Sequence, residues 1–241
     1  MAPFYTFSPK TTTISFSWPK EITGLERIAL SAQGDLQRIL SAFFARPIVL
    51  ALIYSHTYTR RPDTSLVPLT LPNPCALASV SLESPIVQNR QVHLQCGGKV
   101  VCTATSTVTI HSSRCADLFI GQKYGIGQLF AKLGTPPTFE LLNVGIGGKD
   151  IEKDHAGGPH LWRKYRLSVP EIECEILEVF ASRDMFVGGQ AWLDDQRNGD
   201  HVALSPLRVF RRPTTNQLLW FALFSMLAFE VYMYAGPSRC A

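Results

Sequence analysis

The spacing of apolar residues predicts two short helices near the start of the chain. Leu25, Ile28 and Ala29 are apolar at helical spacing, which favours a first helix. Asp35 is suited to cap a second helix, because its side chain can accept a hydrogen bond from a free backbone N–H group. Pro47 should end that helix, because a proline disfavours helical backbone in the residue before it. Within it, apolar residues recur at i, i+3, i+4, i+7 and i+8: Leu36, Ile39, Leu40, Phe43 and Phe44.

The pattern then changes from helical spacing to that of strands. Residues 48–54 form an apolar, partly β-branched run, which predicts a strand buried on both faces. Residues 90–95 and 100–110 flank the Gly97-Gly98 pair, whose tolerance of positive φ suits a tight hairpin turn. Threonine and valine recur at period two in the second arm, as expected of a strand. These segments predict one buried strand followed by a β-hairpin.

The second half of the chain repeats this change of spacing. Residues 125–133 predict a short helix that ends at Gly134, a residue suited to the left-handed conformation after a helix. Residues 139–144 predict a strand. Residues 162–169 and 172–180 predict a hairpin whose turn is Pro170-Glu171.

Two stretches indicate irregular connections between these elements. Residues 61–86 are rich in Pro, Ser, Thr and Leu, and residues 145–158 are polar and rich in glycine. The predicted order is therefore two helices, three strands, one helix and three strands. Because hairpins dominate, we expect an α+β fold with a mostly antiparallel six-stranded sheet and helices covering one face.

Composition narrows the class of protein. Of the 241 residues, 46% are hydrophobic and 17% charged, so the charged fraction lies below the ~25% of an average soluble domain and favours a sizeable core. The net charge is +4, but Lys and Arg are dispersed, so we expect no nucleic-acid partner. The six cysteines form no CxxC pair and the histidines no metal spacing, so we expect reduced thiols and no metal. No apolar signal segment opens the chain, which favours a cytoplasmic location.

One segment departs from the pattern of a soluble domain. Residues 218–235 are apolar apart from Glu230 and follow the Arg211-Arg212 pair. The length meets the lower limit for a membrane span, but a carboxylate inside a span is costly. Three interpretations stay open: a tail anchor, a helix lying on a membrane or a partner, and a helix packed on the rest of the protein.

Two charged residues are the main candidates for chemistry. Arg90 and Glu178 each lie at or within a predicted strand among apolar neighbours. Charged groups in buried strands are costly unless they are paired or functional. The alternatives are an internal salt bridge, an edge position, or a binding or catalytic site. The Gly125-Ile-Gly127 sequence opens a predicted helix, and its backbone amides suit either an anion or a simple turn.

Several short motifs occur in one order along residues 34–186. They are GDLQRILSAFF from Gly34, RQVHL from Arg90 with its Gly-Gly hairpin and Thr-rich return strand, IGQLF from Ile126, LWRKYRL from Leu161 and ILEVF from Ile176. In order and spacing these motifs resemble the chorismate pyruvate-lyase family, also called 4-hydroxybenzoate synthases. The resemblance implies three parts for the chain: an N-terminal extension (1–22), a chorismate-lyase-like domain (23–186) and a C-terminal extension (187–241).

The resemblance implies an enzyme that converts chorismate to 4-hydroxybenzoate and pyruvate without metal or organic cofactor. By resemblance, Arg90 binds the aromatic carboxylate and Glu178 contacts the ring hydroxyl end. By resemblance, Leu36 and Ile126 lie on lid-like helical segments whose backbone amides help to hold the ligand, and Gly127 is a further expected binding residue. A planar guanidinium suits a carboxylate, and a desolvated glutamate with a raised pKa suits an acid or a base.

One departure from the family concerns the return strand. The family usually has a charged residue where this chain has Thr105 or Ser106, and Thr105 is the candidate we expect to line the site. A less charged ligand would explain it, so the second hypothesis is a cyclase, isomerase or pericyclase of secondary metabolism. The third is a non-catalytic small-molecule-binding module. The expected partner is a small aromatic or pre-aromatic carboxylate substrate.

Overall fold

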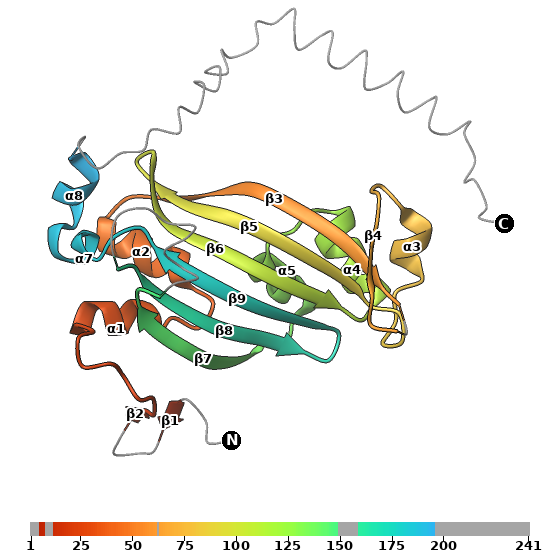
Figure 1. Cartoon of the computed structure of the whole chain (residues 1–241), viewed down its shortest axis with the longest axis horizontal. Helices are drawn as coiled ribbons and strands as arrows, with labels where there is room; N and C mark the ends of the chain where they lie inside the picture. Colours follow the sequence, from red (N-terminus) through yellow and green to blue (C-terminus); the bar gives the residue numbers. More distant parts are fainter. Residues whose placement is uncertain (1–4, 8–11, 62, 149–158, 196–241) are drawn as a thin grey trace, which may run out of the picture. The chain divides into compact units, whose positions relative to one another are not determined.

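The computed structural model describes residues 5–7, 12–61, 63–148 and 159–195. A seven-stranded antiparallel sheet with the order β4-β3-β5-β6-β9-β8-β7 dominates these residues (Figure 1). This confirms the α+β class and the antiparallel sheet, and the additional strand β4 lies in the expected irregular connection. The strands are β3 (Ile48–Arg60), β4 (Leu66–Pro68), β5 (Ile86–Cys96), β6 (Lys99–Ile110), β7 (Thr138–Ile146), β8 (Leu161–Val169) and β9 (Ile172–Phe180). The strands β1 (Tyr5–Phe7) and β2 (Thr12–Ile14) pair with each other in a separate two-stranded sheet.

Short helices complete the fold, and α2, α4 and α5 lie on the same side of the sheet in Figure 1. Their buried apolar residues belong to one core with those of the sheet. The helices are α1 (Gly24–Leu30), α2 (Leu36–Phe44), α3 (Pro74–Ala78), α4 (Ser113–Ala116), the π-helical turn η1 (Asp117–Gly121), α5 (Ile126–Leu133), α7 (Asp184–Gly188) and α8 (Gln190–Asp194).

The two predicted N-terminal helices are present, but the first one buries a different face. In α1, Leu25 and Ile28 are exposed, while Ala29, Leu30 and Glu26 are buried. Glu26 faces inward because its carboxylate accepts hydrogen bonds from Arg183 and from the backbone at the start of the helix. The prediction that Leu25 and Ile28 belong to the buried face of this helix is therefore wrong.

The second helix, α2, follows the prediction closely. Leu36, Leu40 and Phe44 are buried, and the chain leaves the helix at Ala45 with φ of 49°. Asp35 occupies the N-cap position but makes no capping hydrogen bond, because its carboxylate pairs with Arg38.

Strand β3 is longer than predicted and is not buried on both faces. Val49, Leu50, Leu52 and Ile53 are all exposed. Strand β4 pairs only with the last three residues of β3, so the first part of β3 forms an edge of the sheet. The apolar run predicted a strand correctly and its burial incorrectly.

Both predicted hairpins are confirmed. Gly97 and Gly98 have φ of 58° and 88° in the turn between β5 and β6, a conformation that residues with a Cβ rarely adopt. Strands β8 and β9 pair from Val169 and Ile172 onward, so their turn lies where Pro170-Glu171 predicts it.

The remaining expectations on the whole chain have mixed outcomes. Cys75 is disulfide-bonded, so the expectation of reduced thiols is wrong there, whereas Cys96, Cys102, Cys115 and Cys174 are free and buried.

Within the described ranges no helix has the length and apolar character needed to cross a membrane, and no cluster of side chains is suited to hold a metal ion. Residues 218–235 lie outside the described residues, and the three-part division of the chain stays a prediction.

Candidate functional site

Strand register brings Arg90 and Glu178 to the same face of the sheet. One row of directly paired residues runs Arg90, Ser106, Ile176 and Tyr165 across β5, β6, β9 and β8. The next row runs Val92, Ala104, Glu178 and Arg163. Directly paired residues of antiparallel strands share a face, as do residues two apart. We call this side, which contacts the helices, the helix-covered face.

Glu178 lies in a buried polar cluster on this face. Its Oε2 accepts a hydrogen bond of 2.6 Å from Nε of Arg163, and its Oε1 accepts one of 2.9 Å from the hydroxyl of Tyr165. The guanidinium carbon of Arg163 lies 4.6 Å from the centre of the Tyr165 ring. Burial first, and then the Glu178 carboxylate, raise the pKa of Tyr165 well above its ordinary value, so the hydroxyl remains a donor. Both carboxylate oxygens of Glu178 are therefore engaged within the protein.

Arg163 connects this cluster to the helices, and the sequence interpretation did not select it. Its side chain is fully buried, and Nη1 donates to the carbonyl oxygens of Ala29, Leu30 and Ala32, the last at 2.5 Å. Burial by itself would lower the pKa of Arg163, but the Glu178 carboxylate, together with Tyr165 and Cys102, outweighs it and raises that pKa. Arg163 thus joins β8 and β9 to the end of α1 and the residues that follow it.

Arg90 has a different environment. It is half-buried, and its guanidinium carbon lies 5.2 Å from the centre of the Phe119 ring in η1. Burial lowers the pKa of Arg90, while Cys174 acts in the opposite direction. Among the described residues no carboxylate forms an ion pair with Arg90. Arg90 is therefore a desolvated cation with an aromatic neighbour and no counter-ion from the described part of the chain.

The other predicted site residues are only partly brought together. Leu36 and Ile126 are the first residues of α2 and α5, and Gly127 is the second residue of α5. Thr105 is paired with Gln91 and Leu177, which places it on the opposite face from Arg90, and its hydroxyl accepts a hydrogen bond from the Gln91 amide. Ser106, the alternative on this strand, is buried directly beside Arg90.

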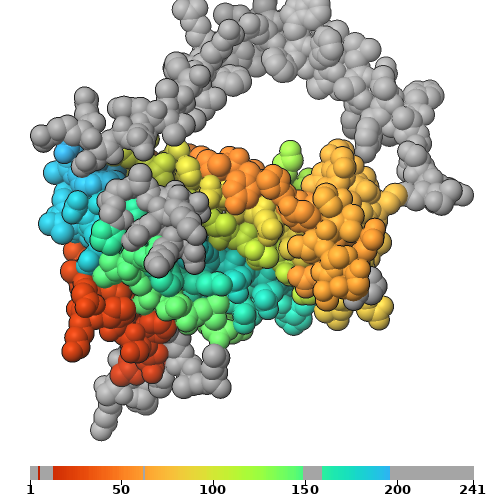
Figure 2. All heavy atoms as spheres, viewed as in Figure 1, coloured from red at the N-terminus to blue at the C-terminus, as the bar shows by residue number. Residues whose placement is uncertain are grey.

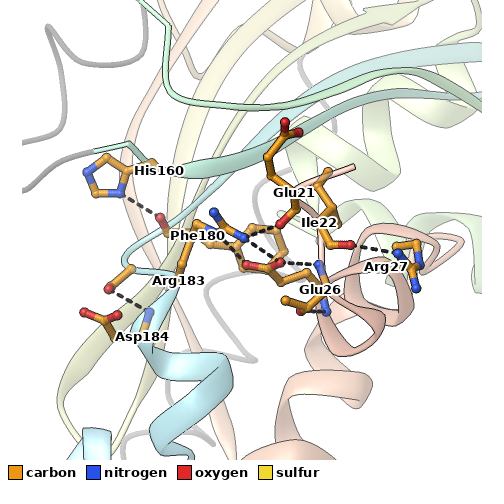
Figure 3. Close-up of polar contacts among 10 residues, drawn as sticks. Glu21, Ile22, Glu26, Arg27, His160, Phe180, Arg183 and Asp184 are labelled. Atoms are coloured by element: carbon orange, nitrogen blue, oxygen red, sulfur yellow. Dashed lines mark hydrogen bonds and ion pairs between the residues drawn. The ribbon is translucent and has the colours of Figure 1, made fainter. Parts of the chain in front are cut away.

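A cavity of about 850 Å³ lies elsewhere, between the start of α1, the start of β8 and α7. Glu26 and Arg183 in its wall form a two-point ion pair at 2.6 and 3.0 Å, and Arg183 also donates to the carbonyl of Glu21 (Figure 3). Burial opposes ionisation of Glu26, but the hydrogen bonds from Arg183 and Thr23 and the charge of Arg183 together outweigh it and lower the pKa of that carboxyl. Nδ1 of His160 lies 2.9 Å from the carbonyl oxygen of Phe180. None of the predicted site residues is among the described residues that line this cavity.

One titratable group outside both regions yields a test of pH dependence. Burial, and to a lesser extent Arg60, lower the pKa of His111, while Glu173 opposes them. The folded state thus binds this proton less readily than the unfolded chain, so stability should fall as the pH drops below about 6.5 and level off below the folded-state pKa. His111→Asn should reduce the loss of unfolding free energy between about pH 7 and pH 5, measured by urea titration. An equal loss in the variant and the natural protein would contradict this.

Comparisons with known proteins add one distant similarity of structure. No protein-family model matches the chain, and no curated protein does. The chain is similar to the solved structure described as a possible transcriptional regulator, YydK, from Bacillus subtilis subsp. subtilis str. 168. The identity is 12% over 75% of this chain and 73% of that one, with a TM-score of 0.35. A similarity of this size carries no argument about ligand or activity.

Proposed function

We propose that this chain binds a small aromatic or pre-aromatic carboxylate on the helix-covered face of the sheet, with Arg90 holding the carboxylate. The observation that carries this proposal is the absence of a counter-ion for Arg90 among the described residues, despite its partial burial. A desolvated charge is costly unless a partner compensates it. A carboxylate ligand supplies that partner, because the guanidinium fork can donate two parallel hydrogen bonds to it.

The surroundings of Arg90 support a planar, largely apolar ligand. Phe119 lies against the guanidinium, and such stacking leaves its in-plane N–H groups available. On the sheet, Arg90 is followed on the same face by Val92 and is flanked by Ser106, with Ile176 one strand further away. These side chains offer one hydroxyl and several apolar surfaces, which suits an aromatic ring better than a sugar or a nucleotide.

The test is calorimetric titration of the full chain with 4-hydroxybenzoate and with its neutral amide. We expect the acid to bind, the amide to bind more weakly, and Arg90→Gln to weaken binding of the acid roughly 10- to 100-fold. Arg114→Gln, which removes an exposed arginine of α4, is the matched control and should bind like the natural protein. Equal affinities for Arg90→Gln and Arg114→Gln would overturn the proposal.

A finer proposal is that the same site carries out the chorismate-lyase reaction. Its support is the resemblance in sequence, together with the position of Glu178 one row from Arg90 on the same face. Against it, both oxygens of Glu178 are engaged by Arg163 and Tyr165, which favours the non-catalytic binding module. Incubation with chorismate should release pyruvate and 4-hydroxybenzoate in equal amounts if the lyase proposal is right. Binding of 4-hydroxybenzoate without any pyruvate would leave the binding module as the function.

A further inference from the structure

The first part of β3 forms an open edge of the sheet. On its outer side, β4 pairs only with Tyr58, Thr59 and Arg60, and the N–H of Leu69 donates to the carbonyl of Thr57. Within the described residues no strand pairs with the outer side of residues 49–56. The backbone of an edge strand presents alternating donors and acceptors, so it can accept another extended segment.

Large apolar side chains are exposed on both faces of this edge. The exposed fractions are 60% for Val49, 50% for Leu50, 58% for Leu52 and 48% for Ile53. Leu50 and Leu52 pair with Leu94 and Val92 and so share the helix-covered face, whereas Val49 lies on the opposite face. Exposure on only one face would suit a ligand groove. Exposure on both faces of one strand is what an added strand would cover. Figure 2 shows one side of this edge, in orange.

The usual features that protect an edge strand are scarce here. Natural edges are commonly protected by charged side chains, prolines or bulges. No Asp, Glu, Lys, Arg or Pro occurs from Ile48 to Tyr58, and the single irregularity is the shift of register between Leu52 and Tyr54. The uninterrupted open segment therefore precedes this bulge and contains Val49, Leu50 and Leu52.

We propose that this segment pairs with the same segment of a second copy, in an antiparallel arrangement about a two-fold axis. An edge strand is complementary to its own reversed copy, because each presents the same alternation of donors and acceptors. The segment carries no charge, so two copies approach without like-charge repulsion. Arg46, the nearest preceding cation, is already paired with Asp194. Arg90 and Glu178 lie on β5 and β9, outside this segment, so the molar mass measured without ligand tests the dimer separately from the proposed ligand site.

The first test is the molar mass of the full chain in solution, measured by analytical ultracentrifugation over a wide range of concentration. We expect a concentration-dependent dimer. Leu50→Lys and Leu52→Lys should each weaken it about tenfold or more, because like charges would face each other across the axis. Val187→Lys, which alters an 89% exposed apolar residue of α7, is the matched control and should leave the dimer intact. Far-ultraviolet circular dichroism of each variant verifies that it folds.

A mixing experiment distinguishes a second copy from any other occupant. At a concentration just sufficient to dimerise the natural protein, Leu50→Lys and Leu50→Glu should each be mostly monomeric alone and should form a mixed dimer when combined, because opposite charges then meet near the axis. A natural protein that stays monomeric at every concentration would overturn the proposal. Dimers that persist in both lysine variants would also overturn it, because they would place the interface on another surface. Folded Lys and Glu variants that fail to combine would exclude the symmetric pairing.

Discussion

Replacing Arg163 with methionine should destabilise the fold by about 3–5 kcal/mol, among the largest effects expected of a single substitution in this protein. The change would leave the Glu178 carboxylate buried without its cation. It would also remove the donor that serves the carbonyl oxygens of Ala29, Leu30 and Ala32 at the end of α1. Urea unfolding followed by tryptophan fluorescence gives the change in unfolding free energy.

A neighbouring residue on the same strand provides the control for this experiment. Lys164 forms an ion pair with Glu175 in which both side chains are more than one-third exposed, so Lys164→Met should cost no more than about 1 kcal/mol. Changing Glu178 to leucine in the Arg163→Met background should restore part of the lost stability, because no buried charge then remains unpaired. If Arg163→Met and Lys164→Met have similar costs, the buried pair does not stabilise the fold in the way described.

The sequence contains enough information to identify the partner of Glu178. A turn at Pro170-Glu171 pairs Val169 with Ile172, and counting outward along both strands places Arg163 opposite Glu178. The resemblance of the LWRKYRL motif gives no partner for Glu178, whereas the register of the hairpin does. The register therefore explains why a glutamate occupies position 178 of a buried strand: it forms an internal salt bridge with Arg163. For Arg90 the register gives no charged neighbour on the adjacent strands.

The expectation for Thr105 shows where such counting fails. If the hairpin at Gly97-Gly98 kept the register that pairs Gln95 with Val100, Thr105 would stand opposite Arg90. The register shifts by one residue between Leu94 and Gln95, and this bulge places Ser106 there instead. A shift of one residue moves a side chain to the other face of the sheet, and no residue type in this segment marks the bulge.

Two further differences arise from contacts between distant parts of the chain. Glu26 turns α1 inward because it meets Arg183, which is 157 residues away along the sequence. The apolar run at the start of β3 has the same composition whether it lies in the centre of a sheet or at its edge, and the strand order decides which. Local patterns therefore predicted α1, α2, α5, the long strands of the sheet and both hairpin turns, but not β4 or the short helices α3, α4, α7 and α8. Burial depended on pairings that no local pattern contains.

Phe180→Ala should have the second large effect, a loss of about 3–5 kcal/mol of unfolding free energy. Phe180 is fully buried at the end of β9, and its ring packs edge-on against Phe186 of α7 at a centroid distance of 5.4 Å. Removal of the ring leaves a cavity that rigid strands cannot close. The loss should appear as a lower urea midpoint with an unchanged slope.

Two substitutions separate the effect of the ring from that of the backbone at this position. Phe180 also accepts a hydrogen bond from His160 through its carbonyl oxygen, and every side-chain substitution keeps that oxygen. Phe180→Leu retains much of the apolar volume and should cost clearly less than Phe180→Ala. Val187→Ala, in the exposed part of α7, should change stability by no more than about 0.5 kcal/mol. Equal costs for the alanine and leucine variants would mean that the volume of the ring does not hold α7 against the sheet. In that case packing would not explain why the last residue of the ILEVF motif, Phe180, is a phenylalanine.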